Sequence, residues 1–326
     1  MLALPSMVAA QQSVVPPDQF TGLAPLPAVN AYGMPLAQND AAIDQARLLR
    51  DATPPTNTGV NAYGTALPET EPTASEDDSF GAQMILKQQE RVRSFVITGG
   101  ASLAYTSNVA LTRRGERHDV FAVVDAGIGW SKRLTNELET SIGAHVSIFR
   151  YNRTPDLDFE NIGFSAGLGW TPRSMGGISF FGRYDFTELL DRGGGEILME
   201  HALTVGVQKT IALGRSHGFS LGFSATAALS DPDAAQRQQI GAFISYHLQL
   251  TRKLETAVLF RPAVHFYSDS DRTDFNQIIS WTLRYRITSW ADVVASVSHG
   301  FNRSDRSVFD YDVLTSGAAV ALSIRF

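Results

Sequence analysis

The stretch that decides the fold class is Val120-Phe121-Ala122-Val123-Val124-Asp125-Ala126-Gly127-Ile128-Gly129-Trp130. Its even positions are apolar from Val120 to Trp130, whereas Asp125, Gly127 and Gly129 lie between them. Successive side chains of a β-strand point to opposite faces, so a period of two is typical of a strand with one apolar face. These residues therefore predict a long β-strand.

The same alternation recurs from Ser94 to Phe326 in segments of about ten residues or more, which is the length that crosses a bilayer at a tilt. Strands of a soluble sandwich average only about five or six residues. The number of segments is even, so the start of the first strand and the end of the last strand lie on the same side of the membrane. The pattern predicts an all-β protein, a transmembrane antiparallel up-and-down β-barrel of about 12 strands over residues 94–326.

The predicted connections alternate in length, which suggests an orientation. Short turns are expected near residues 131–136 and 251–255, whereas residues 107–117, 190–196, 268–276 and 302–312 form longer, charged connections. Outer-membrane barrels have short periplasmic turns and longer external loops. Aromatic residues beside the short turns then form a periplasmic girdle, namely Trp130, Trp170, Trp290 and Phe326.

Composition excludes several classes of protein. The chain has 326 residues, of which 44% are hydrophobic, but no apolar run approaches the roughly 20 residues of a membrane helix. The absence of cysteine excludes disulfides, Cys-ligated metals and thiol nucleophiles. The net charge of -6 comes almost entirely from the N-terminal segment, and no part of the chain has the basic patch of a nucleic-acid-binding protein.

Three segments precede the barrel. Residues 1–10 resemble the remnant of a signal peptide, with cleavage expected after Ala10, although an ordinary apolar N-terminus would look the same. Residues 11–81 are Pro-rich and lack periodicity, which predicts a largely disordered periplasmic segment. Residues 82–93 contain good helix formers and predict a short helical lead into the first strand.

The N-terminal segment contains one repeat, Val29-Asn30-Ala31-Tyr32-Gly33 and Val60-Asn61-Ala62-Tyr63-Gly64. Tyr32 and Tyr63 offer apolar area with a polar tip, so residues 27–68 are a candidate docking segment for a periplasmic or envelope protein. Chance duplication in a segment of biased composition explains the repeat equally well.

The last residues are Val320-Ala321-Leu322-Ser323-Ile324-Arg325-Phe326. With Leu322, Ile324 and the terminal Phe326 at alternate positions, they resemble the C-terminal assembly signal of bacterial outer-membrane proteins. Tyr105-Thr106-Ser107-Asn108-Val109 also resembles the opening of a β-barrel porin family known mainly as a sequence class. These resemblances imply insertion by the barrel assembly machinery, contact with outer-membrane lipid, and a channel.

The lumen is the place to seek functional residues, because ionisable groups at membrane depth must face a polar interior. The alternation directs the following residues inward: Asp125, Glu139, His247, Arg261, His265, Arg284 and Arg286. The acidic and basic groups lie roughly opposite each other in a closed barrel of about 12 strands, so they would create a transverse field across a channel. Alternatively, they pair directly and form a salt-bridged interior.

Small inward residues favour a passage slightly. They include Gly100, Gly127, Gly129, Gly143, Gly163, Gly167 and Gly222. Their lack of bulk leaves space that either water and solute or the chain's own residues 82–93 would occupy.

An enzymatic alternative rests on His299 and Ser316, on adjacent strands with outward parity, since a Ser–His pair is what acyl transfer needs. No carboxylate is placed to orient the imidazole, so we expect no catalytic residues. His145, His247 and His265 lie on three different strands, so neither a metal nor another cofactor is expected.

The sequence thus predicts an outer-membrane β-barrel that acts as a porin-like channel for small hydrophilic solutes. The alternative is a structural or export component of a cell-envelope assembly, with a polysaccharide, secretion or S-layer partner. In that alternative the N-terminal segment is a periplasmic docking tether.

Overall fold

The computed structural model describes residues 94–214, 216–268 and 271–326. The predictions for residues 1–10, 11–81 and 82–93, and for Tyr32 and Tyr63, therefore lie outside the described residues. No helix in the described part of the chain is long and apolar enough to cross a membrane.

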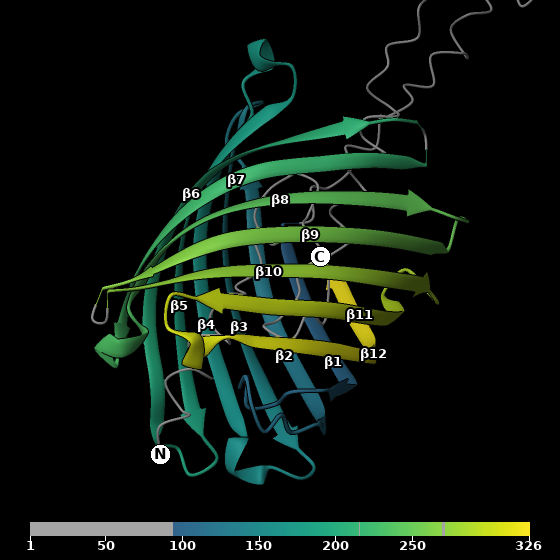
Figure 1. Ribbon diagram of the computed structural model, residues 1–326. Coiled ribbons are helices and arrows are strands. Elements are labelled where there is room, and N and C mark those ends of the chain that lie inside the picture. The colour runs from purple at the N-terminus through teal and green to yellow at the C-terminus, as the bar shows by residue number, and fades with distance from the viewer. Residues whose placement is uncertain (1–93, 215, 269–270) are drawn as a thin grey trace, which may run out of the picture.

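The described residues form twelve antiparallel strands in one closed barrel (Figure 1). The strands are β1 Phe95–Thr106, β2 Asp119–Arg133, β3 Leu138–Tyr151, β4 Phe159–Trp170, β5 Ile178–Asp191, β6 Glu196–Ala212, β7 His217–Asp231, β8 Arg237–Gln249, β9 Leu254–Tyr267, β10 Arg272–Arg286, β11 Ala291–Ser304 and β12 Tyr311–Arg325. Each strand pairs with its neighbours in sequence, and β1 pairs with β12. The predicted up-and-down barrel of about 12 strands is confirmed.

The first and last strands close the barrel at one end. The Phe95 amide donates to the Phe326 carbonyl over 3.1 Å, and the Phe326 amide donates to the Phe95 carbonyl over 3.0 Å. The two aromatic rings are stacked, with their centroids 6.1 Å apart. Closure pairs the edges that an open sheet would leave exposed. We call this end, where β1 begins and β12 ends, the near end, and the opposite end the far end.

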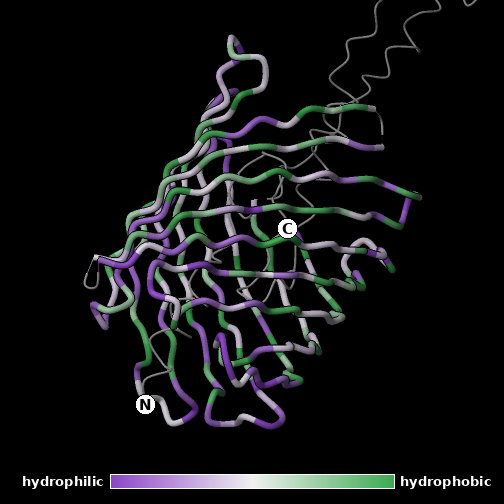
Figure 2. Tube along the Cα trace, viewed as in Figure 1, coloured by the Kyte–Doolittle hydropathy of each residue, from purple (hydrophilic) through white to green (hydrophobic). Residues whose placement is uncertain are grey.

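The outer wall is covered by exposed apolar side chains. Leu103, Phe223, Leu229 and Ile240 have exposed fractions of 61%, 60%, 64% and 59%, and they come from β1, β7 and β8. Hydrophobic and hydrophilic residues alternate along the strands, as Figure 2 shows. An apolar surface of this extent is unfavourable in water and is what a lipid-facing barrel wall requires. The barrel is therefore a transmembrane barrel.

The strands are longer at the far end than the sequence predicted. The far connections 192–195 and 268–271 are as short as the near connection 134–137, and 107–118 is much longer than these. Residues 272–276, expected in a loop, continue the ladder with residues 263–267 of β9. The predicted contrast in connection length is thus wrong for the connections 192–195 and 268–271, because backbone pairing extends the strands that they join.

Four short 3₁₀ helices lie in the connections: η3 Pro155–Leu157, η4 Arg173–Met175, η5 Asp233–Ala235 and η6 Ser307–Phe309. Three of them, η3, η5 and η6, are at the far end. Their single turns compact the far connections against the ends of the strands.

The far end also contains an apolar core inside the barrel. Its buried members are Ala104, Val109, Phe121, Val123, Phe149, Tyr151, Phe159, Leu189, Leu198 and Ala235. The rings of Phe149 and Phe159 stack at 4.2 Å between centroids, and those of Phe121 and Tyr151 lie 5.2 Å apart. The expectation of small or polar inward residues is therefore wrong for the far ends of β2–β6, where side chains pack together as in the core of a soluble domain. We call this set the far core.

Candidate functional site

The seven ionisable residues singled out from the sequence all lie on the inward-facing parity of their strands. Asp125 is on β2, Glu139 on β3, His247 on β8, Arg261 and His265 on β9, and Arg284 and Arg286 on β10. The flanking residues Val124 and Tyr285, by contrast, are exposed on the outer wall. Inward placement follows from alternation alone. Whether these residues control selectivity stays a prediction.

Charge is distributed unevenly around the inner wall. The inward face of β8–β11 carries five arginines, Arg237, Arg261, Arg272, Arg284 and Arg286, against Glu255, Asp274 and Asp292. The inward face of β2–β6 carries five carboxylates, Asp119, Asp125, Glu139, Asp185 and Glu200, against Arg133 and Arg183. The inward face of β8–β11, which we call the basic wall, therefore carries an excess of positive charge, whereas that of β2–β6 carries an excess of negative charge.

Several inward charges are neutralised by partners on the same wall. The Arg183 Nε lies 2.7 Å from the Asp185 Oδ2 within β5, and these side chains are 8% and 2% exposed. The Arg286 Nε lies 4.0 Å from the Asp292 Oδ1 across β10 and β11. These local pairs neutralise part of the charge in the lumen. Only the remaining charges can contribute to a field across the barrel. Sequence reasoning missed Arg183 and Asp185, although their inward parity was visible.

Arg272 is held in a fixed orientation at the far end of β10. Its guanidinium carbon lies 3.6 Å from the ring centroid of Tyr267 and 3.8 Å from that of Phe309. Its Nε lies 3.2 Å from the Asp274 Oδ1. Cation–π contacts on both faces and a carboxylate at the edge restrict the guanidinium strongly. The sequence analysis placed this segment in a loop and so missed both Arg272 and Asp274.

The connection between β1 and β2 folds toward the lumen. Asn108 is fully buried, and its Nδ2 donates to the carbonyl of Thr112 over 2.8 Å and to that of Asp312 over 3.1 Å. The next residue, Val109, is part of the far core. These contacts fix residues 108–112 at the far end, whereas residues 113–118 are exposed to solvent.

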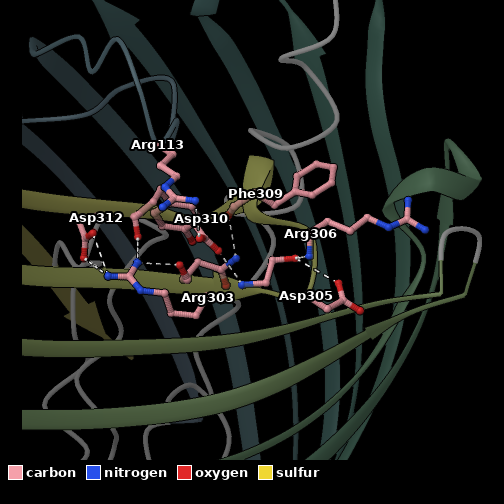
Figure 3. A network of polar contacts seen from close by, with 10 residues as sticks. Arg113, Arg303, Asp305, Arg306, Phe309, Asp310 and Asp312 are labelled. Atoms are coloured by element: carbon pink, nitrogen blue, oxygen red, sulfur yellow. Dashed lines mark hydrogen bonds and ion pairs between the residues drawn. The ribbon is translucent and has the colours of Figure 1, made fainter.

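The connection between β11 and β12 meets this loop at the far end (Figure 3). The Arg113 Nη1 lies 3.5 Å from the Asp310 Oδ2, which joins the two connections. The Ser304 amide also donates to the Asp310 Oδ1 over 2.8 Å, and the Asn302 Nδ2 donates to the Phe309 carbonyl over 3.0 Å. We call residues 107–118 and 305–310 together the far lid, because Arg113 and Asp310 link these two neighbouring connections at the far end of the barrel.

The Ser–His pair weighed for catalysis lies on the outer wall. His299 is directly opposite Leu314, and Ser316 is directly opposite Val297, so the two residues are diagonal neighbours. The His299 ring faces Phe301, with centroids 5.8 Å apart. No hydrogen bond joins His299 and Ser316 within the described residues. The register therefore does not place the hydroxyl against the imidazole as acyl transfer needs.

The structure gives the positions of the remaining residues singled out from the sequence, but their roles stay predictions. Leu322, Ile324 and Phe326 all point outward at the near end, with exposed fractions of 39%, 55% and 56%. Their role as an assembly signal stays a prediction. Among residues 94–214, 216–268 and 271–326 there is no cluster of three or more His, Cys, Asp or Glu side chains that could hold a metal ion.

Comparison with known proteins identifies the fold. No protein-family model matches the sequence, and no curated protein matches it. The structure is similar to an outer membrane channel from Pseudomonas putida F1, with a TM-score of 0.53 and 8% identity over 71% of this chain and 96% of that chain. It also resembles the CymD monoaromatic hydrocarbon channel, with a TM-score of 0.42 and 9% identity over 72% of this chain and 89% of that chain. The KdgM porin gives a TM-score of 0.38 and 7% identity over 70% and 99%.

Of these three, the Pseudomonas putida channel alone exceeds a TM-score of 0.5, and identity of 8% establishes the fold and no more. The chain therefore has the fold of a bacterial outer-membrane barrel, with the membrane location that its apolar exterior requires. The organisation of its lumen has to be argued from its own residues.

Proposed function

We propose that this chain is a porin-like channel for small hydrophilic solutes. The observation that carries the proposal is the contrast between the two faces of one closed wall. Outside, large apolar side chains face lipid; inside, arginines, carboxylates and hydroxyls line the lumen from β2 to β12. An ionisable side chain at membrane depth costs free energy unless it faces a polar interior.

The two ends of the barrel would have different roles in such a channel. In outer-membrane barrels both chain ends of the barrel lie on the periplasmic side, so the near end is periplasmic and the far lid faces the exterior. The far lid and the far core then narrow the external mouth. Transport through this mouth requires either a passage beside the far core or movement of the lid.

Planar-bilayer recording of the purified full chain tests the proposal. A channel gives discrete conductance steps in KCl, whereas a protein that is folded and heat-modifiable on gels but electrically silent would contradict it. A parallel measurement with the far lid destabilised separates a closed channel from a solid barrel, because only a closed channel gains conductance.

The N-terminal segment supports a second proposal, that residues 27–68 tether a periplasmic or envelope partner. The duplicated Asn-Ala-Tyr-Gly motif favours it. A peptide spanning residues 27–68 should retain a defined partner that the Tyr32→Ala, Tyr63→Ala peptide loses. Equal recovery by both peptides would leave the repeat as a spacer.

A further inference from the structure

All exposed charged side chains that the structure describes at the near end are basic. They are Lys132, Arg133, Arg173, Arg252 and Lys253. The far end differs, because acids such as Glu116 and Asp156 are exposed there beside exposed arginines. We call the five basic residues the near rim.

The near rim occupies two opposite sides of the barrel mouth. Lys132 and Arg133 end β2, beside the connection to β3, and Arg173 lies in η4 between β4 and β5. Arg252 and Lys253 lie in the connection between β8 and β9. Six strands separate the β2–β3 connection from the β8–β9 connection in either direction around the closed barrel. The near rim therefore consists of two basic groups on opposite sides of the near mouth.

The acids beside the near rim do not neutralise it. Within the described residues, no ion pair involves any of its five members. Glu137, Glu139 and Glu255 are half-buried. The Glu137 Oε1 accepts from the backbone amide of Arg173 over 3.3 Å, and Glu139 is opposite Arg133 in the β2–β3 ladder. The near rim therefore has an excess of exposed positive charge.

The chain contains a complementary segment that is joined to this end. Residues 69–78 include no basic residue and five acids, Glu69, Glu71, Glu76, Asp77 and Asp78. Residues 79–93 connect this segment to β1 and span at most about 54 Å when extended. Twelve tilted strands that lie about 4.8 Å apart form a mouth roughly 20–25 Å across. The acidic segment can therefore reach every member of the near rim.

We propose that residues 69–78 bind across the near mouth, with the near rim as their docking surface. Extended, this segment spans about 33–36 Å, so it is long enough to contact both basic groups at once. A single exposed ion pair is weak, but a short tether raises the effective concentration of the segment to about the millimolar range. Several pairs formed together then hold the segment in place at low ionic strength.

Disulfide cross-linking of the full chain in phosphatidylcholine vesicles tests this contact, because the chain has no cysteine of its own. The Ser75→Cys, Ser174→Cys variant carries one thiol within the acidic segment and one beside Arg173, and copper phenanthroline is the oxidant. The matched control carries the same two cysteines together with Glu69→Gln, Glu71→Gln, Glu76→Gln, Asp77→Asn and Asp78→Asn. Its tether has the same length, so chance collisions are equally frequent. At low salt, cross-linking should be several-fold faster with the acids than without them.

Salt and the position of the basic residues give two further readouts. KCl at about 1 M shortens the Debye length to about 3 Å, so it should slow cross-linking of the acidic segment to the rate of the control. Arg252→Gln, Lys253→Gln, on the opposite side of the mouth from Ser174, should also slow it. Arg114→Gln, Arg117→Gln removes two exposed charges from the far end and should have no effect.

Equal cross-linking rates for the acidic and the neutralised segment overturn the proposal, and so does an acidic segment whose rate is insensitive to salt. Equal rates together with anionic phospholipid retained by the near rim in native mass spectrometry would assign the near rim to lipid headgroups instead. Heat-modifiable migration on gels shows that each variant is folded. The cross-linking does not depend on conductance, so an electrically silent barrel would contradict the channel and leave this inference standing.

Discussion

The Arg183–Asp185 pair on β5 offers a quantitative test of how dry the lumen is. The side chains are 8% and 2% exposed and lie 2.7 Å apart. Removing one member of a buried pair leaves an uncompensated charge and typically costs about 3–5 kcal/mol, whereas an exposed pair is worth about 0–1 kcal/mol. The Asp185→Leu variant should therefore lose about 3–5 kcal/mol of unfolding free energy.

The double variant Arg183→Met, Asp185→Leu removes both charges and should behave differently. Replacing a buried pair by apolar residues of similar volume is often neutral or stabilising by about 1–4 kcal/mol. The double variant should thus recover at least the stability that the Asp185→Leu variant loses. Reversible urea unfolding of the protein in lipid vesicles measures all three free energies.

The Arg303–Asp312 pair provides the matched control. Its atoms lie 3.1 Å apart, but both side chains are 51% exposed at the far end. Asp312→Leu, the same chemical change, should cost about 1 kcal/mol or less. A cost below about 1 kcal/mol for Asp185→Leu as well would refute the burial argument, because it would mean that Arg183 does not depend on Asp185 to compensate its charge.

Three further predictions concern transport. Arg284→Gln should shift the reversal potential of a KCl gradient toward cation selectivity, because it removes a positive charge from the basic wall; an unchanged potential would place Arg284 outside the ion path. Arg113→Asp and Asp310→Arg should each raise the conductance by breaking the ion pair within the far lid, and the combined charge swap should restore the wild-type conductance. Arg114→Asp, a change at an exposed neighbour, should have no effect. Deleting residues 11–92 behind an intact signal should raise single-channel conductance if residues 82–93 close the near end, and an unchanged value in a folded barrel would show that they do not.

The inward direction of the predicted lumen residues needed only the sequence. Asp125 and Arg284 are flanked by apolar neighbours at alternate positions, and alternation is a local property of any paired strand. The alternation along one strand is therefore enough to place both side chains in the interior, without knowledge of the partner strands. The same alternation also places Arg183 and Asp185 inward, because both lie between outward-facing residues of β5.

The position of Arg272 and Asp274 could not be read from the sequence. Polar residues at 268–276 have the composition of a loop, but pairing with residues 263–267 of β9 extends the strand through them. Strand ends depend on partners that are far away in the chain, and loop composition does not report those partners. The lumen charge at the far end was underestimated as a result.

The sequence by itself determined the class of the protein: a barrel of long alternating strands, apolar toward lipid and polar toward the lumen. The tertiary structure alone decided how the far end is filled. The far core joins Val109 of a loop to Phe121 and Phe149 of two strands. Alternation specifies which face a side chain occupies, but closure and register decide which side chains meet there.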